Sequence, residues 1–301
     1  TKVAFTAKSP AVAADTNGLN DIYVRSGSAT TLRSVTSAND TVSADSDNAS
    51  IDSNGDVAWT SNGAFATTDT NSLYDVFVRQ DLFLGPFQDV PYFTGVQLQR
   101  FRGAAPSGSA VAAQAALIRA GASPLHFIVK LSDEPSFSAK RAPLTRLYWA
   151  YFKRRPDLGG LNYWLKQYEG GKRLVDISQQ FAKSSEFKTK YGNTTPEQFV
   201  TLVYQNVLER NPESGGLAYW ADKIRAGTPR GQVMTNFSES SEGKRVIGPR
   251  SDSILIALGM YGKIPSQALF DAMVADRQAG WPREIIPAYI LGAPEYAATL
   301  T

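Results

Sequence analysis

The segment Arg154–Trp164, RRPDLGGLNYW, governs the interpretation of most of this 301-residue chain. It combines two arginines, a carboxylate, a glycine pair and a Tyr-Trp pair, which are residue types common in ligand-binding loops. A second copy, RNPESGGLAYW, occupies positions 210–220, so that position i corresponds to position i+56. A binding site is usually unique, whereas a structural turn recurs with every repeat that contains it. We therefore interpret the segment as a turn between helices.

The spacing around the two copies defines a helical repeat. The same offset also relates Gly171 to Gly227 and relates the "SSE" at 184–186 to that at 240–242. Each unit is predicted as a helix, a Pro/Gly turn, a helix with the Tyr-Trp pair, a glycine stop and a third helix that ends in "SSE". Copies of one supersecondary unit at a fixed period are typical of repeat proteins.

The segment between the two motifs has the periodicity of an amphipathic helix. Thr195 and Pro196 are typical of a helix start. The segment that follows has a buried-face pattern at i, i+3, i+4, i+7 and i+8, formed by Phe199, Leu202, Val203, Asn206 and Val207. Glycines at 121 and 280 mark weaker flanking copies. The sequence therefore predicts an all-α stack of three to four three-helix repeats over residues 111–301, with units at about 111–140, 144–192, 196–248 and 251–301.

The N-terminal part has a different repeat. VAFTAKSPAVAADTNGLNDIYVR (3–25) recurs as VAWTSNGAFATTDTNSLYDVFVR (57–79), so that position i corresponds to position i+54. Short apolar alternations and the hairpin signal Asn54-Gly55 predict antiparallel strands. Residues 81–110 form a transition, in which DLFLGPFQDVPYFTGVQLQRF (81–101) is aromatic and still strand-like and RGAAPSGSA (102–110) is small and flexible. We therefore expect an α+β multidomain chain, with a β-rich domain over residues 1–103 that includes a transition segment.

Both repeats resemble known bacterial families. The β repeats resemble blades of TolB-like, WD40-type β-propellers, although only about one and a half blades are present and closure takes 4–8. The helical motif R-x-P-D-x-x-G-L-x-Y-W…F-x-x-S-x-E-F resembles a bacterial domain-of-unknown-function family of helical repeats. That family occurs in surface-layer proteins, secreted adhesins and secreted calcium-dependent proteins, and is similar to phycobilisome linker repeats. The resemblance implies an accessory role in attachment, spacing or assembly.

Composition excludes several classes of protein. The chain has no cysteine, so disulfides and thiol chemistry are excluded. Residues 1–80 hold five Lys/Arg and nine Asp, a net charge of −4, which leaves +7 for the remainder of a chain whose total is +3. Nucleic-acid binding is not indicated, because the sequence shows no concentrated basic face with interleaved aromatic residues. No apolar run approaches the roughly 20 residues needed to span a membrane. The chain begins at Thr1 with no Met, so we expect a mature or trimmed chain, which a removed export signal would fit.

Two sets of residues are candidates for sites. The Asp/Asn loops suit Ca²⁺, which prefers several oxygen ligands, or else ordinary turn chemistry. Their candidate ligands are Asp15, Asn17, Asp21, Asp69, Asn71 and Asp75. The Tyr-Trp pairs suit stacking on sugar rings or core packing, and core packing is favoured. The motif residues to which we assign a structural role are Pro156, Asp157, Gly160, Tyr163, Trp164, Pro212, Glu213, Gly216, Tyr219 and Trp220.

The sequence contains no recognisable catalytic constellation. Its only histidine, His126, lies in an apolar helical segment without the partners that catalysis requires. We expect a non-enzymatic bacterial protein, secreted or at the cell surface, that acts through protein–protein contacts with partners or with copies of itself. The alternative is a carbohydrate-binding or anchoring accessory region of a larger secreted enzyme, which would contact a cell-surface glycan.

Overall fold

The computed structural model describes most of the chain. The residues it describes are 2–13, 15–26, 29–34, 42, 44–51, 57–65, 73–79, 84–87 and 89–300. The chain forms two compact units: Thr1–Phe83 with Ala112–Pro124, and Leu84–Val111 with Leu125–Thr301. The predicted hairpin signal at Asn54-Gly55 lies outside the described residues.

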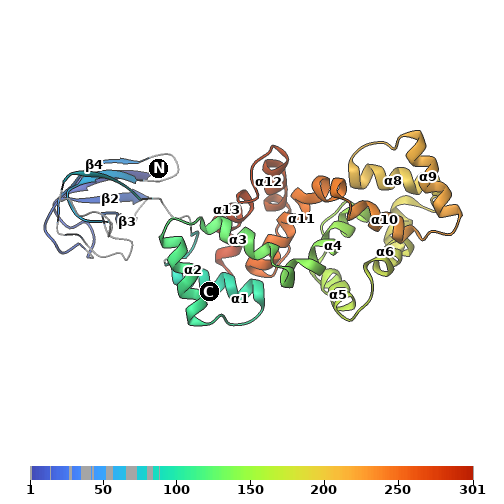
Figure 1. Cartoon of the computed structure of the whole chain (residues 1–301), viewed down its shortest axis with the longest axis horizontal. Helices are drawn as coiled ribbons and strands as arrows, with labels where there is room; N and C mark the ends of the chain where they lie inside the picture. The colour runs from blue at the N-terminus through green and yellow to red at the C-terminus, as the bar shows by residue number, and fades with distance from the viewer. Residues whose placement is uncertain are drawn as a thin grey trace. The chain divides into compact units, whose positions relative to one another are not determined.

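Antiparallel strands build the first part of the chain. Strands β1 (Lys2–Ala7), β2 (Asp21–Ser26) and β3 (Ala29–Leu32) form one sheet in that order. A second sheet consists of β4 (Ser46–Ile51), β5 (Val57–Ser61) and β6 (Asp75–Arg79). Figure 1 shows these strands at the N-terminal end of the chain and helices after them. The α+β class is thus confirmed, and the resemblance to propeller blades stays a prediction.

The two copies of the β repeat preserve one aromatic cross-strand pair. Phe5 on β1 lies opposite Tyr23 on β2, with ring centroids 5.5 Å apart. At the equivalent positions of the second copy, Trp59 on β5 lies opposite Phe77 on β6 at 5.8 Å. Directly opposed aromatic side chains stabilise antiparallel strands. The repeat therefore preserves the cross-strand contact along with the sequence pattern.

The expectation of strand-like structure over residues 81–101 is wrong from residue 90 onward, where the chain is helical. Helix α1 (Val90–Arg102) lies in the middle of residues 81–110, and the side chain of Asp89 caps it by accepting from the backbone N–H of Tyr92 at 2.7 Å. Pro91 lies in the first turn, where a proline costs no helical hydrogen bond. Phe93 and Phe101 belong to the buried face of this helix and not to a strand. That buried face follows the helical period and consists of Val90, Phe93, Thr94, Gln97, Leu98 and Phe101.

Helices make up the remainder of the described chain. The first group is α2 (Gly108–Arg119), α3 (Pro124–Asp133), α4 (Pro135–Phe152), α5 (Leu158–Glu169), α6 (Leu174–Lys183) and α7 (Ser185–Tyr191). The second group is α8 (Pro196–Val203), a π-helical turn η1 (Tyr204–Leu208), α9 (Ser214–Arg225), α10 (Arg230–Ser238), α11 (Ser241–Tyr261), α12 (Gln267–Gln278), α13 (Ile285–Gly292) and α14 (Pro294–Ala297).

The same backbone turns recur four times along these helices. Gly103, Lys153, Glu209 and Gly262 each end a helix, or the π turn η1, in the left-handed conformation, with φ between 50° and 71°. At position i+18 from each of them is a glycine with φ between 97° and 101°, namely Gly121, Gly171, Gly227 and Gly280. Only glycine adopts such a φ without strain. The predicted glycine stops therefore coincide with backbone positions that need glycine.

Equivalent positions of the two middle repeats meet one another. Asn206 donates from Nδ2 to the Ala150 carbonyl at 2.9 Å, and positions 150 and 206 differ by the repeat offset of 56. The side chains of Lys153 and Glu209, which are equivalent by the same offset, pair at 3.5 Å. Contacts between equivalent residues are typical of self-complementary pairing around a two-fold axis. The middle repeats thus pack as a pair.

Helices α6 and α10, which are also equivalent, pack closely at one glycine. Gly231 on α10 donates its N–H to Gln179 Oε1 at 2.7 Å, and Ser178 Oγ donates to the Gly231 carbonyl at 2.9 Å. A Cβ on Gly231 would collide with the backbone of Gln179. Figure 1 shows α6 beside α10 and α4 beside α11. The absence of a side chain at Gly231 therefore sets the distance between the paired repeats.

We predict that Asn206→Ala lowers the free energy of unfolding by about 1–3 kcal/mol, because it leaves the buried last-turn carbonyl of Ala150 without its side-chain donor. Urea unfolding followed by circular dichroism measures the change. The matched control is Asn162→Ala, which removes an exposed asparagine from α5. Equal stability losses for the two variants would contradict this account of the pairing contact.

Candidate functional site

The repeated turn is built around a capped helix start. In the first copy, Asp157 precedes α5 and its Oδ1 accepts from the backbone N–H of Gly160 at 2.7 Å. Pro156, directly before it, is buried. An aspartate in this position satisfies one of the amide groups that every helix start leaves unpaired. The carboxylate of the motif is therefore engaged in capping α5.

The second copy uses its acid differently. Glu213 makes no side-chain capping bond at the start of α9. Its Oε2 accepts from Arg210 Nη1 at 2.8 Å, and its Oε1 accepts from the hydroxyl of Tyr204 at 3.3 Å. A backbone hydrogen bond and then the Arg210 hydrogen bond lower the pKa of Glu213. The replacement of Asp157 by a longer acid thus changes a cap into an ion pair.

The second glycine of each Gly-Gly pair leaves room for a tyrosine. A Cβ on Gly160 would lie 2.6 Å from the hydroxyl oxygen of Tyr148, and a Cβ on Gly216 would lie 2.5 Å from that of Tyr204. Both tyrosines are buried, and burial is the largest cause that raises the pKa of each. A Cβ on Gly159, in contrast, would lie 3.6 Å from its nearest neighbour. Gly160 and Gly216 are therefore required by side-chain packing.

The first arginine of each motif copy binds a glutamate later in the same repeat, a contact that the sequence did not predict. Arg154 binds Glu186 with both Nε (2.6 Å) and Nη2 (2.8 Å), and Arg210 binds Glu242 through Nε at 3.1 Å. The expected contacts with the turn acids are also present, Arg154 to Asp157 at 3.8 Å and Arg210 to Glu213 at 2.8 Å. A common spacing could have predicted the Arg–Glu pairs from the sequence. Both pairs, and also Arg102–Glu134, join positions i and i+32.

The "SSE" segments begin helices as well as ending them. Ser184 ends α6 and also caps α7 by accepting from the Phe187 N–H at 3.1 Å. Ser240 caps α11 in the same way through Gly243 at 3.0 Å. The expectation that this segment only terminates the third helix is therefore incomplete. Its serine is a cap, and its glutamate reaches back to the arginine of the same repeat.

The Tyr-Trp pairs have one exposed and one partly buried ring. Tyr163 and Tyr219 are each 55% exposed, whereas Trp164 and Trp220 pack partly against the core. In both repeats the two rings meet edge to face, at 4.9 Å in the first and 5.1 Å in the second. The tryptophans also contact Phe181 and Phe237, at 5.3 Å in each case. Core packing accounts for the tryptophans, and the tyrosines remain available at the surface.

The first Asp/Asn loop directs its oxygens into turn contacts. Asp15 Oδ1 accepts from the Asn17 N–H at 3.3 Å, and Asn17 Oδ1 accepts from the Leu19 N–H at 2.8 Å. Asp21 accepts from Ser34 at 2.5 Å, and burial raises the pKa of its carboxyl. Tyr23 donates to the second oxygen of Asp15. These are the turn hydrogen bonds that the sequence offered as the alternative to calcium binding in this loop.

Of the remaining candidate calcium ligands, the structure describes only Asp75. Asp69 and Asn71 lie outside the described residues, and Asp75 begins β6. Over the part of the chain that the structure describes, no group of three or more His, Cys, Asp or Glu side chains is arranged to hold a metal ion. His126 is half exposed and contacts Glu284 through Nδ1 at 2.8 Å. Calcium binding therefore stays a prediction.

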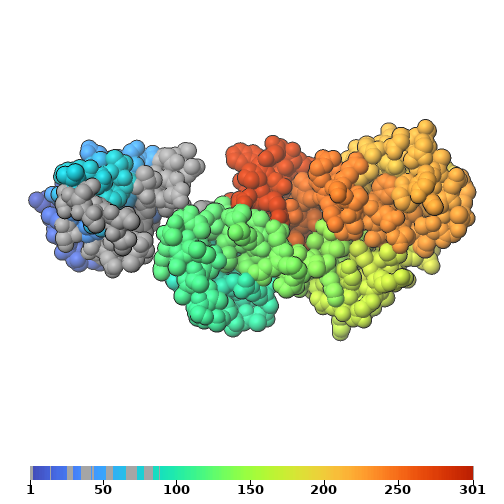
Figure 2. Space-filling model, viewed as in Figure 1, coloured from blue at the N-terminus to red at the C-terminus, as the bar shows by residue number. Residues whose placement is uncertain are grey.

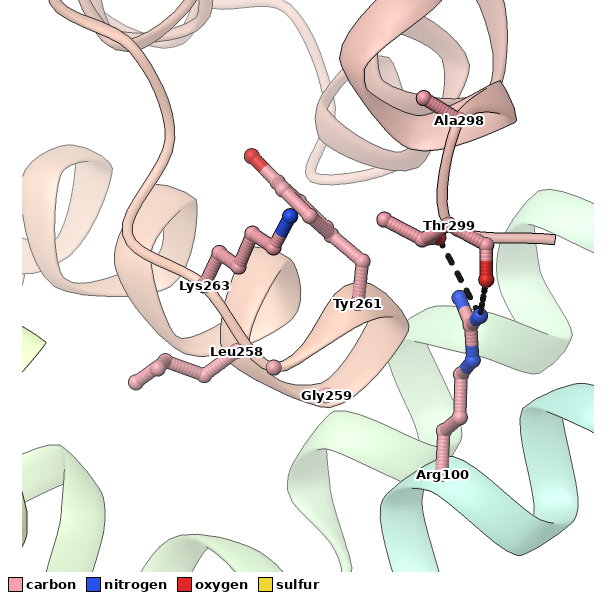
Figure 3. Close-up of a pocket in the computed structure, with 8 residues that line it drawn as sticks. Arg100, Leu258, Gly259, Tyr261, Lys263, Ala298 and Thr299 are labelled. Carbon is pink, nitrogen blue, oxygen red and sulfur yellow. Dashed lines mark hydrogen bonds between the residues drawn. The ribbon is translucent and has the colours of Figure 1, made fainter. Parts of the chain in front are cut away.

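A shallow pocket of about 390 Å³ lies between α1, the end of α11 and the C-terminal residues. Arg100 lies along one side of it and donates from Nη2 to the Thr299 carbonyl at 2.8 Å (Figure 3). The Arg100 guanidinium also donates to the Met260 carbonyl. Tyr261 and Lys263 line the other side. The arginine is thus used to hold the chain together, and no residue that the sequence singled out lines this pocket.

One protein-family model matches part of the middle repeats. Residues 178–247 match a family described as Domain of unknown function (DUF4214). The match begins within α6 and ends within α11, so it includes both members of the α6–α10 pair. No curated protein and no solved structure matches the chain. Among the described residues, we find no helix with the length and hydropathy needed to span a lipid bilayer.

We predict that Gly160→Ala destabilises the protein by about 1–3 kcal/mol, because the added Cβ collides with the buried Tyr148 hydroxyl. Gly159→Ala should change stability by less than about 0.5 kcal/mol or raise it slightly, since alanine favours a helix. The adjacent pair is a matched comparison, measured by chemical unfolding. A larger loss for Gly159→Ala would show that the fit around Tyr148 does not explain the glycine pair.

Proposed function

We propose that this chain is a non-enzymatic bacterial structural protein, secreted or at the cell surface, that acts through protein–protein contacts, including contacts with copies of itself. One observation carries the proposal. The polar groups of the motif that resembles a site, Asp157 with Arg154 and Glu213 with Arg210, make the contacts that hold helices together. Repeating a turn in this way supports an architectural role for the helical units.

The β repeats support contact with other proteins. On the second sheet, Val76 is 70% exposed, and the neighbouring Tyr74 is 64% exposed. Large apolar side chains grouped at the surface mark association sites. A strand at the edge of a sheet also offers unpaired backbone groups to another chain. In this proposal the β repeats are propeller-type blades that complete their sheets by association.

A second candidate function is carbohydrate binding, as an accessory or anchoring region of a larger secreted enzyme. The exposure of Tyr163 and Tyr219 favours it, because an exposed aromatic ring offers an apolar face with a polar tip to a pyranose ring. The two tyrosines occupy equivalent positions, so a glycan with repeated units would find two alike rings on one chain. This candidate is compatible with export and requires no catalytic residue.

Sedimentation velocity over a wide range of protein concentration tests the leading proposal. We expect species heavier than the 32.7 kDa monomer that grow with concentration, because a protein that assembles through its own surfaces associates by mass action. A pull-down with bacterial envelope fragments tests for other partners. A chain that stays monomeric at every concentration and retains no envelope protein would contradict the proposal.

Binding to a glycan array tests the second candidate. We expect Tyr163→Ala and Tyr219→Ala together to remove any glycan binding by the wild-type chain, since truncation removes both exposed rings. Tyr92→Ala is the control, because Tyr92 on α1 is 50% exposed and lies outside the two Tyr-Trp pairs. Equal glycan binding by the double variant and the wild-type chain would rule out stacking on these tyrosines.

A further inference from the structure

The two small β-sheets pack against each other, and each sheet uses a different face to do so. Alternate residues of a strand point to opposite faces of its sheet, so Ile22 and Val24 on β2 share one face of the first sheet. Val57 and Trp59 on β5 share one face of the second sheet by the same rule. All four side chains form one buried cluster, in which none is more than 3% exposed. One face of the first sheet therefore covers one face of the second.

The repeat offset of 54 gives both sheets the same two faces. We name the face that holds Ile22 and Val24 the front face, and the face that holds Val57 and Trp59 the back face. The equivalent front-face residues of the second sheet are Val76 and Val78, and the equivalent back-face residues of the first sheet are Val3 and Phe5. The inner junction thus joins the front face of the first sheet to the back face of the second.

The other two faces keep apolar residues but are exposed. Val76 on the front face of the second sheet is 70% exposed, whereas its equivalent Ile22 is fully buried. Val3 on the back face of the first sheet is 54% exposed, whereas its equivalent Val57 is fully buried. Figure 2 shows the segment around β6, coloured cyan, at the molecular surface. The same apolar positions are therefore covered at the inner junction and uncovered at the two ends of the sheet pair.

The loop before β6 shows the same contrast. Leu73 and Tyr74 are exposed, whereas their equivalents Leu19 and Asn20 are partly buried. Asn20 contacts the segment that leads into the second sheet, since its backbone N–H donates to Asp45 Oδ1 at 2.8 Å. In the first copy this loop therefore touches the repeat that follows it. In the second copy an apolar loop occupies the equivalent position at the surface, beside the exposed front face.

We propose that the front face of the second sheet, around Val76, packs on the back face of the first sheet, around Val3, of a second copy of this chain. The inference rests on the proposed function, self-assembly, and names the two surfaces that would carry it. The inner junction identifies the occupant, because it shows that a front face of this chain is covered by a back face of this chain.

The two surfaces differ from each other, so the contact is heterologous. Copies joined in this way add head to tail and form a ring or an open filament. The contact consists mainly of apolar side chains, which associate because burial removes their surface from water. Salt screens only charges, so added sodium chloride should not weaken the association.

Two single substitutions in the full-length chain test the proposal. Val76→Asp places a carboxylate on the front face of the second sheet, and Val3→Asp places one on the back face of the first. Both side chains are more than half exposed, so each variant should keep the fold, which circular dichroism and chemical unfolding check. We expect each to raise the apparent dissociation constant for self-association at least about tenfold, because a charge replaces an apolar contact. Sedimentation velocity measures the change.

Mixing the two variants tests the direction of the contact. The Val76→Asp chain keeps an intact back face, and the Val3→Asp chain keeps an intact front face. Each variant alone should be monomeric, whereas an equimolar mixture should form a dimer of about twice the 32.7 kDa monomer mass and grow no further. Leu117→Asp is the matched control, because Leu117 is an equally exposed apolar residue on α2, and it should leave self-association nearly unchanged.

The results separate this inference from the proposed function. If the wild-type chain never self-associates, the inference and self-assembly both fail. If it does, the inference alone is overturned when Val76→Asp or Val3→Asp weakens association no more than Leu117→Asp does, or when the mixture stays monomeric. A wild-type chain that stays monomeric but retains an envelope protein through Val76 also overturns it, because the front face would then bind a different partner.

Discussion

A buried tyrosine lies at the centre of each middle repeat, and the surrounding contacts depend on it. Tyr148 packs edge to face on Phe181 at 5.0 Å, and the guanidinium of Arg154 lies over its ring at 5.5 Å. Its hydroxyl occupies the space that a side chain at Gly160 would fill. The tyrosine therefore connects the end of one helix, the next turn and the third helix. Tyr204 does the same in the following repeat, with Phe237 and Arg210 as its neighbours.

Pairing of equivalent positions is a second constraint, and it distinguishes the middle repeats from a simple open stack. In an open stack each unit presents one face to the next unit and a different face to the previous one. Here position 150 meets position 206, and position 153 meets position 209. The flanking repeats show a related contact, since Arg100 on α1 donates to a last-turn carbonyl of α11. A self-complementary face that is occupied within the chain is not available to a second copy, so any association of copies would have to use other surfaces.

The sequence predicted the features that depend on local geometry. Glycine spacing located the left-handed turns at Gly171 and Gly227, and Thr195 with Pro196 located a helix start, because these positions depend on the backbone of a few adjacent residues. The Arg–Glu closure and the Asn206 contact were missed, because they join residues far apart in the chain. Residues 90–102 were misjudged because their aromatic content outweighed a helical period that was present.

Duplication also separates what the fold needs from what the surface is free to vary. The second glycine and the first arginine of the turn, which are the same in both middle repeats, are satisfied by internal contacts. The position that holds Lys166 in one repeat and Asp222 in the next is exposed in both copies. A fold that accepts either charge places no structural demand on such a position. The difference in charge at this position is therefore not imposed by the fold, and duplication leaves such an exposed position free to differ.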